Sequence, residues 1–229
     1  MRISMKFSGI QKTSLVDFPN RVASVLFTPG CNLRCPYCHN WRIVVDPKPP
    51  FLNDEVTLKI LEERKKFVDA VVVTGGEPTI HKELPRFLKR LKERGFMVKL
   101  DTNGLNPWAL EECLPYVDYV ALDVKTSLGK YGRLGAGDTA ELVHTIEILK
   151  TGKVECEFRT TVVPGFVGEE DLIEIGELVK GVKSFVLQQF VPDDTLDKAL
   201  NSLKPYSRES MAGFAESMKR YAENVMLRA

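Results

Sequence analysis

The sequence lacks an excess of charge of either sign. Its 229 residues carry 32 Lys and Arg against 31 Asp and Glu, which gives a formal net charge of +1. Such a balance provides no broad basic surface for nucleic acid or for an anionic membrane. We therefore expect no nucleic-acid partner and no membrane partner.

Long hydrophobic runs are also absent. The longest, residues 22–27 and 70–73, are too short to span a bilayer. Residues 1–9 have no apolar stretch of the kind that a secretory signal peptide requires. We expect a cytoplasmic protein.

Cysteine is sparse and unevenly placed. The chain has 5 cysteines, an odd number, and three of them lie within residues 31–38. In a reducing compartment such crowding indicates metal binding rather than a disulfide framework.

Apolar, β-branched runs alternate with segments of helical period along the chain. The predicted strands are residues 22–28, 70–74, 97–101, 119–124, 154–163 and 184–189. Six strand–helix units are fewer than the eight of a closed TIM barrel, so they form a partial barrel or an open doubly wound sheet. The predicted fold class is α/β, with residues 1–229 as a single domain and residues 1–20 as a segment before the first barrel strand.

Capping residues predict where the helices begin and end. Asn53 precedes two acidic residues at a helix start, and Gly95, Gly152 and Gly181 each follow an apolar helical stripe. A shorter helix is predicted over residues 108–114. The last predicted helix begins at Ser207 and keeps its apolar stripe as far as residue 225.

A CxxxCxxC motif follows the first predicted strand and supplies Cys31, Cys35 and Cys38. Iron–sulfur clusters are usually held by four cysteine thiolates, so three local cysteines leave one iron with an open position, as a catalytic centre requires. A structural zinc site with His39 is an alternative. A closed electron-transfer cluster would need Cys113 or Cys156 as its fourth ligand; both are otherwise expected to be buried, inert thiols.

Other unusual residues fall at the carboxyl ends of the predicted strands. Gly75 and Gly76 precede Glu77, and paired glycines permit close approach to the backbone. Charged side chains are poor core material unless they are paired. The structural alternatives to a binding role are an Asp–Lys salt bridge and, for Arg159, a pair with Glu157 or another acid. The strand-end side chains are Asp101, Thr102, Asn103, Asp123, Lys125, Arg159 and Gln188.

The cysteine spacing, the aromatic Tyr37 and the GGEP string at residues 75–78 resemble the radical S-adenosylmethionine superfamily. The resemblance implies a partial barrel of six βα units and a 4Fe–4S cluster on the three cysteines. The amino and carboxylate groups of S-adenosylmethionine would chelate the fourth iron, and an electron from the cluster would release methionine and a 5′-deoxyadenosyl radical.

The same resemblance assigns the remaining residues to the cofactor pocket. Residues 75–77 would receive the methionyl amine, Lys125 would neutralise its carboxylate, and Asp123 would bind the ribose hydroxyls. Asp101, Thr102 and Asp123 also offer hard oxygen ligands for a cation beside that carboxylate. The other expected cofactor contacts are Tyr37, His39, Asn103, Arg159 and Gln188.

Segments 11–19, 35–40, 101–104, 123–125 and 159–165 are similar to those of glycyl radical enzyme activases. Within that group, Lys-Thr-Ser-Leu-Val-Asp at residues 12–17 and Leu-Gln-Gln-Phe at residues 187–190 are most similar to the activating proteins of anaerobic ribonucleoside-triphosphate reductase. The pyruvate formate-lyase activase pattern has a histidine where this chain has Val191. The resemblance implies hydrogen abstraction from a glycine of a partner enzyme and an electron donor such as flavodoxin or ferredoxin.

Three other functions stay open at this point. One is activation of pyruvate formate-lyase, and another is radical chemistry on a small molecule. The third is a non-enzymatic electron-transfer or zinc-binding module, because fold and motif alone do not identify a substrate.

Overall fold

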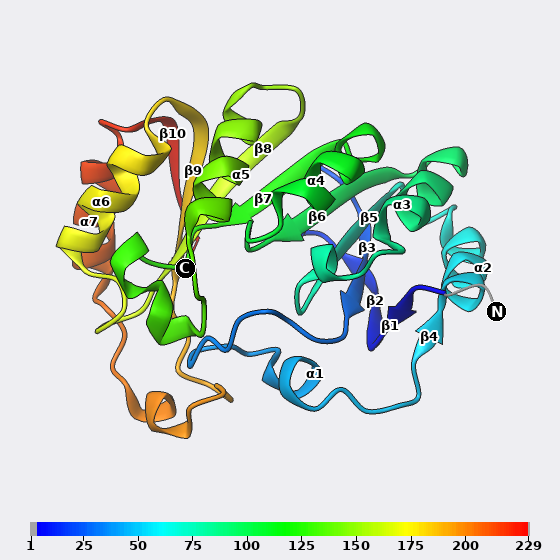
Figure 1. The fold of residues 1–229 in the computed structure, drawn as a ribbon, viewed down its shortest axis with the longest axis horizontal. Helices are drawn as coiled ribbons and strands as arrows, with labels where there is room; N and C mark the ends of the chain where they lie inside the picture. The colour runs from blue at the N-terminus through cyan, green and yellow to red at the C-terminus, as the bar shows by residue number, and fades with distance from the viewer. Residues whose placement is uncertain (1–3, 229) are drawn as a thin grey trace.

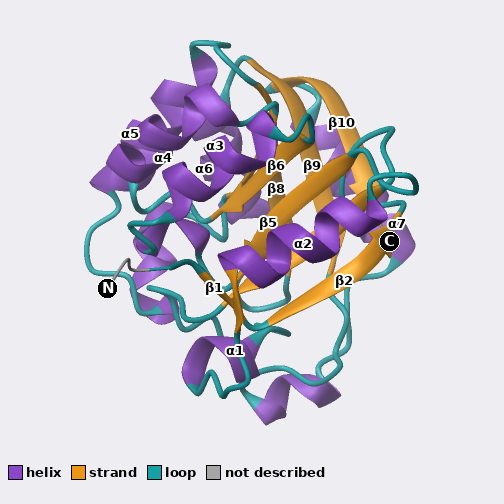
Figure 2. Ribbon diagram, turned by 90° about the vertical axis from the view of Figure 1, so that its right-hand side faces the viewer, coloured by secondary structure: helices purple, strands orange, loops and turns teal. Residues whose placement is uncertain are grey.

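The fold is built on one curved sheet of eight strands, in the order β10-β9-β8-β7-β6-β5-β3-β2 (Figures 1 and 2). The structure is a computed structural model that describes residues 4–228. Neighbouring strands from β3 to β10 are parallel, and β2 pairs antiparallel with β3. The strands are β2 (Gly9–Ser14), β3 (Ala23–Thr28), β5 (Ala70–Gly75), β6 (Met97–Thr102), β7 (Tyr119–Asp123), β8 (Glu155–Val162), β9 (Val182–Gln189) and β10 (Ala222–Arg228).

All six predicted strands are confirmed, and so is the α/β fold with a partial TIM-like barrel. Helices α3 to α6 run along the outer face of the sheet, whereas α1 and the cysteine loop lie at one end of it (Figure 1). The helices are α1 (Trp41–Val45), α2 (Asp54–Arg64), α3 (Leu84–Glu93), α4 (Pro107–Cys113), α5 (Ala140–Lys150), α6 (Glu169–Val179) and α7 (Arg208–Met218).

The predicted capping residues place the helix ends. The Asn53 side chain accepts a hydrogen bond from the Val56 amide at the start of α2, and Ser207 caps α7 in the same way. Gly95, Gly152 and Gly181 follow α3, α5 and α6 with positive φ, a conformation that glycine adopts without steric cost.

The two faces of the sheet differ in composition. Along β6, Val98 and Leu100 point outward into the large apolar core beneath the helices, whereas Lys99 points inward. On the inner face, the apolar cluster that residues 4–228 form is small. It lies at the amino ends of the strands and consists of Phe18, Ala23, Val25, Ala70 and Val72. Toward the carboxyl ends of the strands the inner face is charged.

The carboxyl-terminal part of the chain corrects the sequence prediction. The last helix ends at Met218, and residues 222–228 form β10 on the exposed edge of β9. The apolar stripe after Met218 fits a strand as well as a helix, and pairing with an open sheet edge satisfies backbone groups that a longer helix would leave unpaired on β9.

Three strands in the first 53 residues were missed by the sequence prediction. Strand β2 covers the other edge of the sheet, with Gly9 opposite Phe27. A short antiparallel pair joins β1 (Lys6–Phe7) to β4 (Leu52–Asn53). Isolated runs this short carry no recognisable alternation, so only their tertiary partners define them.

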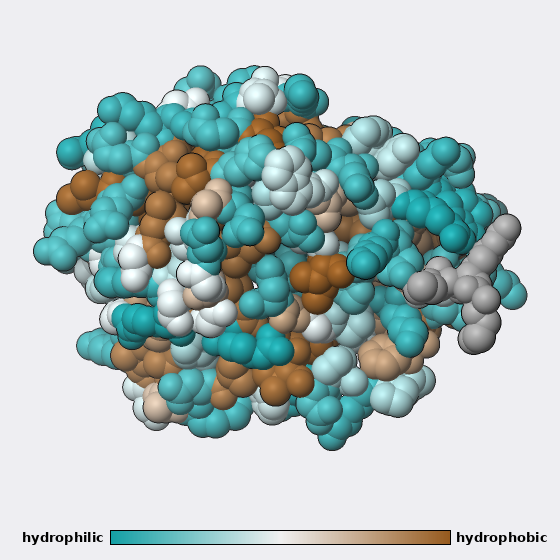
Figure 3. Space-filling model, viewed as in Figure 1, coloured by the Kyte–Doolittle hydropathy of each residue, from teal (hydrophilic) through white to brown (hydrophobic). Residues whose placement is uncertain are grey.

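The exterior of the protein is mixed in character. On the face shown in Figure 3, hydrophobic residues occur in groups that hydrophilic residues interrupt. No helix within residues 4–228 is both long enough and apolar enough to cross a bilayer.

Candidate active site

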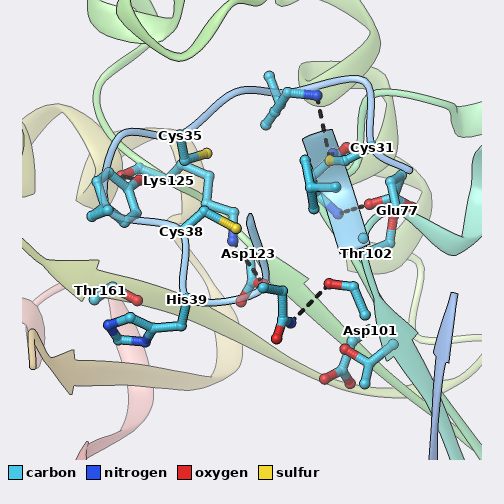
Figure 4. Close-up of a pocket in the computed structure, with 18 of the residues that line it drawn as sticks. Cys31, Cys35, Cys38, His39, Glu77, Asp101, Thr102, Asp123, Lys125 and Thr161 are labelled. Atoms are coloured by element: carbon cyan, nitrogen blue, oxygen red, sulfur yellow. Dashed lines mark hydrogen bonds and ion pairs between the residues drawn. The ribbon is translucent and has the colours of Figure 1, made fainter. Parts of the chain in front are cut away.

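A cavity of about 270 Å³ opens at the carboxyl ends of the parallel strands. It brings together nearly all residues that the sequence singled out (Figure 4). The predicted residues that line it are Cys31, Cys35, Tyr37, Cys38, His39, Gly75, Gly76, Glu77, Asp101, Thr102, Asn103, Asp123, Lys125 and Arg159. Gln188 is not among the lining residues; its Oε1 lies 3.5 Å from the hydroxyl of Thr161, which does line the cavity.

The cysteine loop connects β3 to α1 and folds over the cavity. The Cys38 amide donates a hydrogen bond to the Cys35 carbonyl at 3.0 Å, which forms a tight turn between these two residues. The Leu33 amide points at the sulfur of Cys31 at 3.3 Å. All three cysteine side chains therefore face the cavity from one short loop.

Gly75 and Gly76 allow the end of β5 to approach the cysteine loop. A Cβ at Gly76 would lie 1.7 Å from the carbonyl oxygen of Gly30, and one at Gly75 would lie 2.4 Å from the Thr28 amide nitrogen. The Gly75 carbonyl accepts a hydrogen bond from the Asn40 side chain. The sequence predicted that a ligand would approach these glycines closely. In the structure, the backbone of residues 27–30, just before Cys31, lies against them.

The Glu77 carboxylate holds two strand-end loops together. Its Oε1 accepts hydrogen bonds from both the amide and the hydroxyl of Thr79 and from the hydroxyl of Thr102. Its Oε2 accepts from the Asn103 amide at 2.7 Å. Burial raises the pKa of Glu77, and these hydrogen bonds oppose that rise. Glu77 therefore orders the loop that presents Asn103, whose side chain in turn donates to Asn32 at 2.7 Å.

Asp123, Lys125 and Arg159 form a charged floor under the cysteines. Asp123 accepts from Arg159 Nε at 2.7 Å and from Lys125 Nζ at 2.9 Å. Burial alone would raise the pKa of Asp123, but these two cations hold it well below its ordinary value. Asp101 lies 3.2 Å from Arg159 Nη2 and 2.8 Å from Lys99 Nζ, and the pKa of its carboxyl is also lowered.

Aromatic and histidine side chains flank this floor. Tyr37 is buried, packs edge-on against Phe166, and donates a hydrogen bond to the Lys125 carbonyl at 3.2 Å. The His39 Nε2 lies 2.9 Å from the Val191 carbonyl oxygen, so the ring is anchored to the segment that follows β9. Figure 4 shows His39 and Thr161 together, below the cysteines.

The donor set suits an iron–sulfur cluster better than a single zinc ion. Within residues 4–228, no three His, Cys, Asp or Glu side chains converge closely enough to hold one metal ion. A 4Fe–4S cluster would bind its thiolates at separate irons, so three thiols that line one cavity without converging on a single point fit it. Burial raises the pKa of Cys31 to about 12 and raises those of Cys35 and Cys38. A bound metal would favour the thiolate form of each group.

The two other cysteines lie away from the cavity. Cys113 is fully buried at the end of α4, where burial raises its pKa to about 12. Cys156 lies near the start of β8, close to the Leu149 carbonyl. Neither lines the cavity of the other three. Cys113 is buried as expected, whereas Cys156 is only partly buried and lines a second cavity, so the expected burial is wrong for Cys156. That both thiols are inert stays a prediction.

Sequence reasoning missed Lys99 and Arg228 beneath the site and named Glu157 only as an alternative partner of Arg159, a pairing that the structure contains. Lys99, Glu157 and Arg228 face the inside of the barrel and continue the ion pairs of Asp101 and Arg159. Charges separated by two positions, as at residues 99 and 101 or 157 and 159, are a recognisable sign of an inward-facing polar row. The pairing with Arg228 had no such sign, because its strand was not predicted.

Comparison with known proteins supports the resemblance to radical S-adenosylmethionine enzymes. The Radical SAM superfamily model matches residues 25–179. A Methanocaldococcus jannaschii protein with the provisional name glycyl-radical enzyme activating enzyme is 35% identical over 96% of this chain and 95% of its own. A Staphylococcus aureus pyruvate formate-lyase-activating enzyme is 30% identical over 80% of this chain and 79% of its own.

Solved structures of low sequence identity share the fold. Streptococcus suis SuiB bound to precursor peptide SuiA superposes with a TM-score of 0.67 at 16% identity, over 90% of this chain and 48% of SuiB. This chain therefore spans about half of SuiB. QueE from Escherichia coli has a TM-score of 0.56 at 19% identity, over 82% of this chain and 83% of its own. The family match, the two relatives and the cysteine-lined cavity at the strand ends together show that the chain belongs to the radical SAM superfamily.

Proposed function

We propose that this protein activates a glycyl radical enzyme. The observation that carries the proposal is the cavity in which three thiols face a charged strand-end floor, on a chain that is 35% identical over nearly its whole length to a protein named as such an activase. When bound, the cluster and S-adenosylmethionine supply one-electron cleavage of the carbon–sulfur bond and a carbon radical that removes a hydrogen atom from the partner's glycine. The remaining products are methionine and 5′-deoxyadenosine.

The residues of this chain bind and orient the cofactors. Cys31, Cys35 and Cys38 would hold a 4Fe–4S cluster and would leave one iron open for the methionyl amino and carboxylate groups. Lys125, held by Asp123 on the cavity floor, places positive charge for that carboxylate. Arg159 holds the Asp123 carboxylate through Nε at 2.7 Å, and we assign the ribose hydroxyls to that carboxylate.

Backbone and aromatic groups complete the proposed pocket. The Gly75–Gly76 segment offers main-chain carbonyls to the methionyl ammonium, and Glu77 keeps that segment in place against residue 103. Tyr37 and His39 shield the adenosyl side of the pocket. The cation predicted beside Asp101, Thr102 and Asp123 stays a prediction: both carboxylates are already paired with cations of the chain, so we leave it out of the proposed function.

Anaerobic ribonucleoside-triphosphate reductase is the partner that we propose. The segments around residues 11–19 and 187–190 support this choice, as does Val191 at the position where the pyruvate formate-lyase activase pattern has histidine. We also propose a cytoplasmic location and an electron donor of the flavodoxin or ferredoxin type, because the cluster must be reduced before each cleavage.

Electron paramagnetic resonance tests the function directly. The anaerobically reconstituted protein, reduced and supplied with S-adenosylmethionine, is mixed in turn with anaerobic ribonucleotide reductase and with pyruvate formate-lyase. A glycyl doublet with the reductase supports the proposal, and a doublet only with the lyase keeps the activase function but changes the partner. Cleavage of S-adenosylmethionine without a doublet in any candidate would contradict the activase function and favour a small-molecule substrate.

A further inference from the structure

A chain of ion pairs runs through the barrel below the cavity. It links Arg228 on β10 to Glu157 on β8, then Lys99 on β6, and reaches the cavity floor at Asp101 and Arg159. The Glu157 side chain is 0% exposed and that of Lys99 is 1% exposed. Neither touches the cavity, and the function proposed above makes no use of them.

The negative charge of Glu157 is neutralised mainly by Arg228 on β10. The Arg228 guanidinium binds it with two nitrogens, Nη1 to Oε1 at 3.2 Å and Nη2 to Oε2 at 2.7 Å. Lys99 Nζ and Arg159 Nη1 lie farther away, at 3.9 Å and 3.8 Å from Oε1. A bidentate guanidinium–carboxylate pair is both strong and geometrically fixed.

Arg159 is shared among three carboxylates through three different nitrogens. Its Nε binds Asp123 at 2.7 Å and its Nη2 binds Asp101 at 3.2 Å, while its Nη1 is the nitrogen near Glu157. The guanidinium is planar and rigid, so a stronger pull on Nη1 would move the other two nitrogens as well. The position of Arg159 therefore depends on how well Glu157 is neutralised from the other side.

We propose that Arg228 is a positioning residue for the S-adenosylmethionine pocket, acting through Glu157 and Arg159. When Arg228 is present, Glu157 is satisfied and Arg159 stays on Asp123 and Asp101. When Arg228 is absent, the buried Glu157 carboxylate lacks its main partner, and an uncompensated buried charge is costly. Arg159 and Lys99 then move toward Glu157 and release the two carboxylates at the cavity floor.

The test measures S-adenosylmethionine binding and does not require a partner enzyme. Equilibrium dialysis of the anaerobic, cluster-loaded protein compares wild type with Arg228→Gln, Glu157→Gln and the double variant. Residues that orient metal ligands through hydrogen bonds affect metal affinity or activity by about 10- to 100-fold. Arg228 would act on the pocket in a comparable, indirect way, and we expect Arg228→Gln to weaken S-adenosylmethionine binding about tenfold with unchanged iron content. The double variant removes the acid that would attract Arg159, and we expect its affinity to recover to within about threefold of wild type.

Arg90→Gln is the matched control. Arg90 binds Glu55 with one nitrogen at 2.8 Å and Asp54 with another, between α2 and α3 on the outside of the molecule. Its loss should lower the melting temperature and leave the affinity for S-adenosylmethionine unchanged.

Three results would overturn the proposal: wild-type affinity in Arg228→Gln, no recovery in the double variant, or an equal loss of affinity in Arg90→Gln. The spectrum of the reduced cluster gives a second measurement. Addition of S-adenosylmethionine should change it fully in wild type and in the double variant, but only in part in Arg228→Gln at the same concentration. Because no partner is present, failure to activate a glycyl radical enzyme would leave this result unaffected.

Discussion

The two sides of the barrel wall are equally buried and chemically opposite. On β6, Leu100 and Lys99 are neighbours with 0% and 1% exposure, yet one packs under the helices and the other points into an ion-pair network. On β8, Phe158 and Glu157 repeat this contrast. The outer layer is stabilised by removing apolar surface from water, which needs no particular orientation.

The inner layer obeys a different constraint. Each buried charge there must face an opposite charge, because an unpaired one costs several kcal/mol. Asp123, Asp101 and Glu157 are all paired with lysine or arginine. The outer layer therefore supplies stability, whereas the inner layer fixes the orientation of groups that reach the cavity.

The largest expected difference separates the cysteine loop, which covers the inner layer, from the outer layer. Cys35→Ala should abolish cluster binding and S-adenosylmethionine cleavage, because it removes one of three thiols that line the cavity. Cys113→Ala, in the outer layer, should keep both and lower the free energy of unfolding by about 1 kcal/mol. Iron and sulfide content, 5′-deoxyadenosine formation and urea unfolding measure these effects. Equal iron contents in the two variants would contradict the assignment.

A second contrast concerns pH. At neutral pH, Asp123→Asn should lower the free energy of unfolding by about 3 kcal/mol, since it leaves Arg159 and Lys125 without their shared carboxylate. Leu100→Ala should cost a similar amount, about 2–5 kcal/mol, through its cavity.

The two effects should separate in acid. The folded-state pKa of Asp123 is lowered, so its stabilisation is complete above the unfolded value of about 4 and declines as pH falls below it. The difference between wild type and Asp123→Asn should therefore shrink below about pH 4, whereas that for Leu100→Ala should stay constant. Denaturant unfolding of apoprotein at a series of pH values measures both, and parallel curves for the two variants would refute the distinction.

The smallest expected effect is that of Gln188, at the border of the inner layer. Gln188 faces Thr161 at 3.5 Å and does not line the cavity. Gln188→Ala should therefore change the dissociation constant for S-adenosylmethionine by no more than about twofold, as for substitutions away from key contacts. A tenfold loss of affinity would restore Gln188 to the set of cofactor contacts that the sequence predicted.

Local sequence signals predicted much of this molecule. The six strands and the helix caps at Asn53 and Ser207 were readable because periodicity and capping act over a few residues. The sequence also predicted that Cys31, Asp123 and Arg159 lie in one site. Parallel strands bring their carboxyl ends to one edge, so residues at those ends meet whatever the details of packing.

Other features had no local signal. Strand β10 forms because β9 offers an open edge. The apolar stripe of α7 continues past Met218 in a pattern that fits a helix or a strand. The sequence by itself determined which chemical groups this protein carries and that they gather at the strand ends. Only the tertiary structure decided that Glu157 pairs with Arg228, 71 positions away, and that Gly76 accommodates the cysteine loop. Such contacts depend on which edges and surfaces remain free after the rest of the chain has folded, and no short stretch of sequence contains that information.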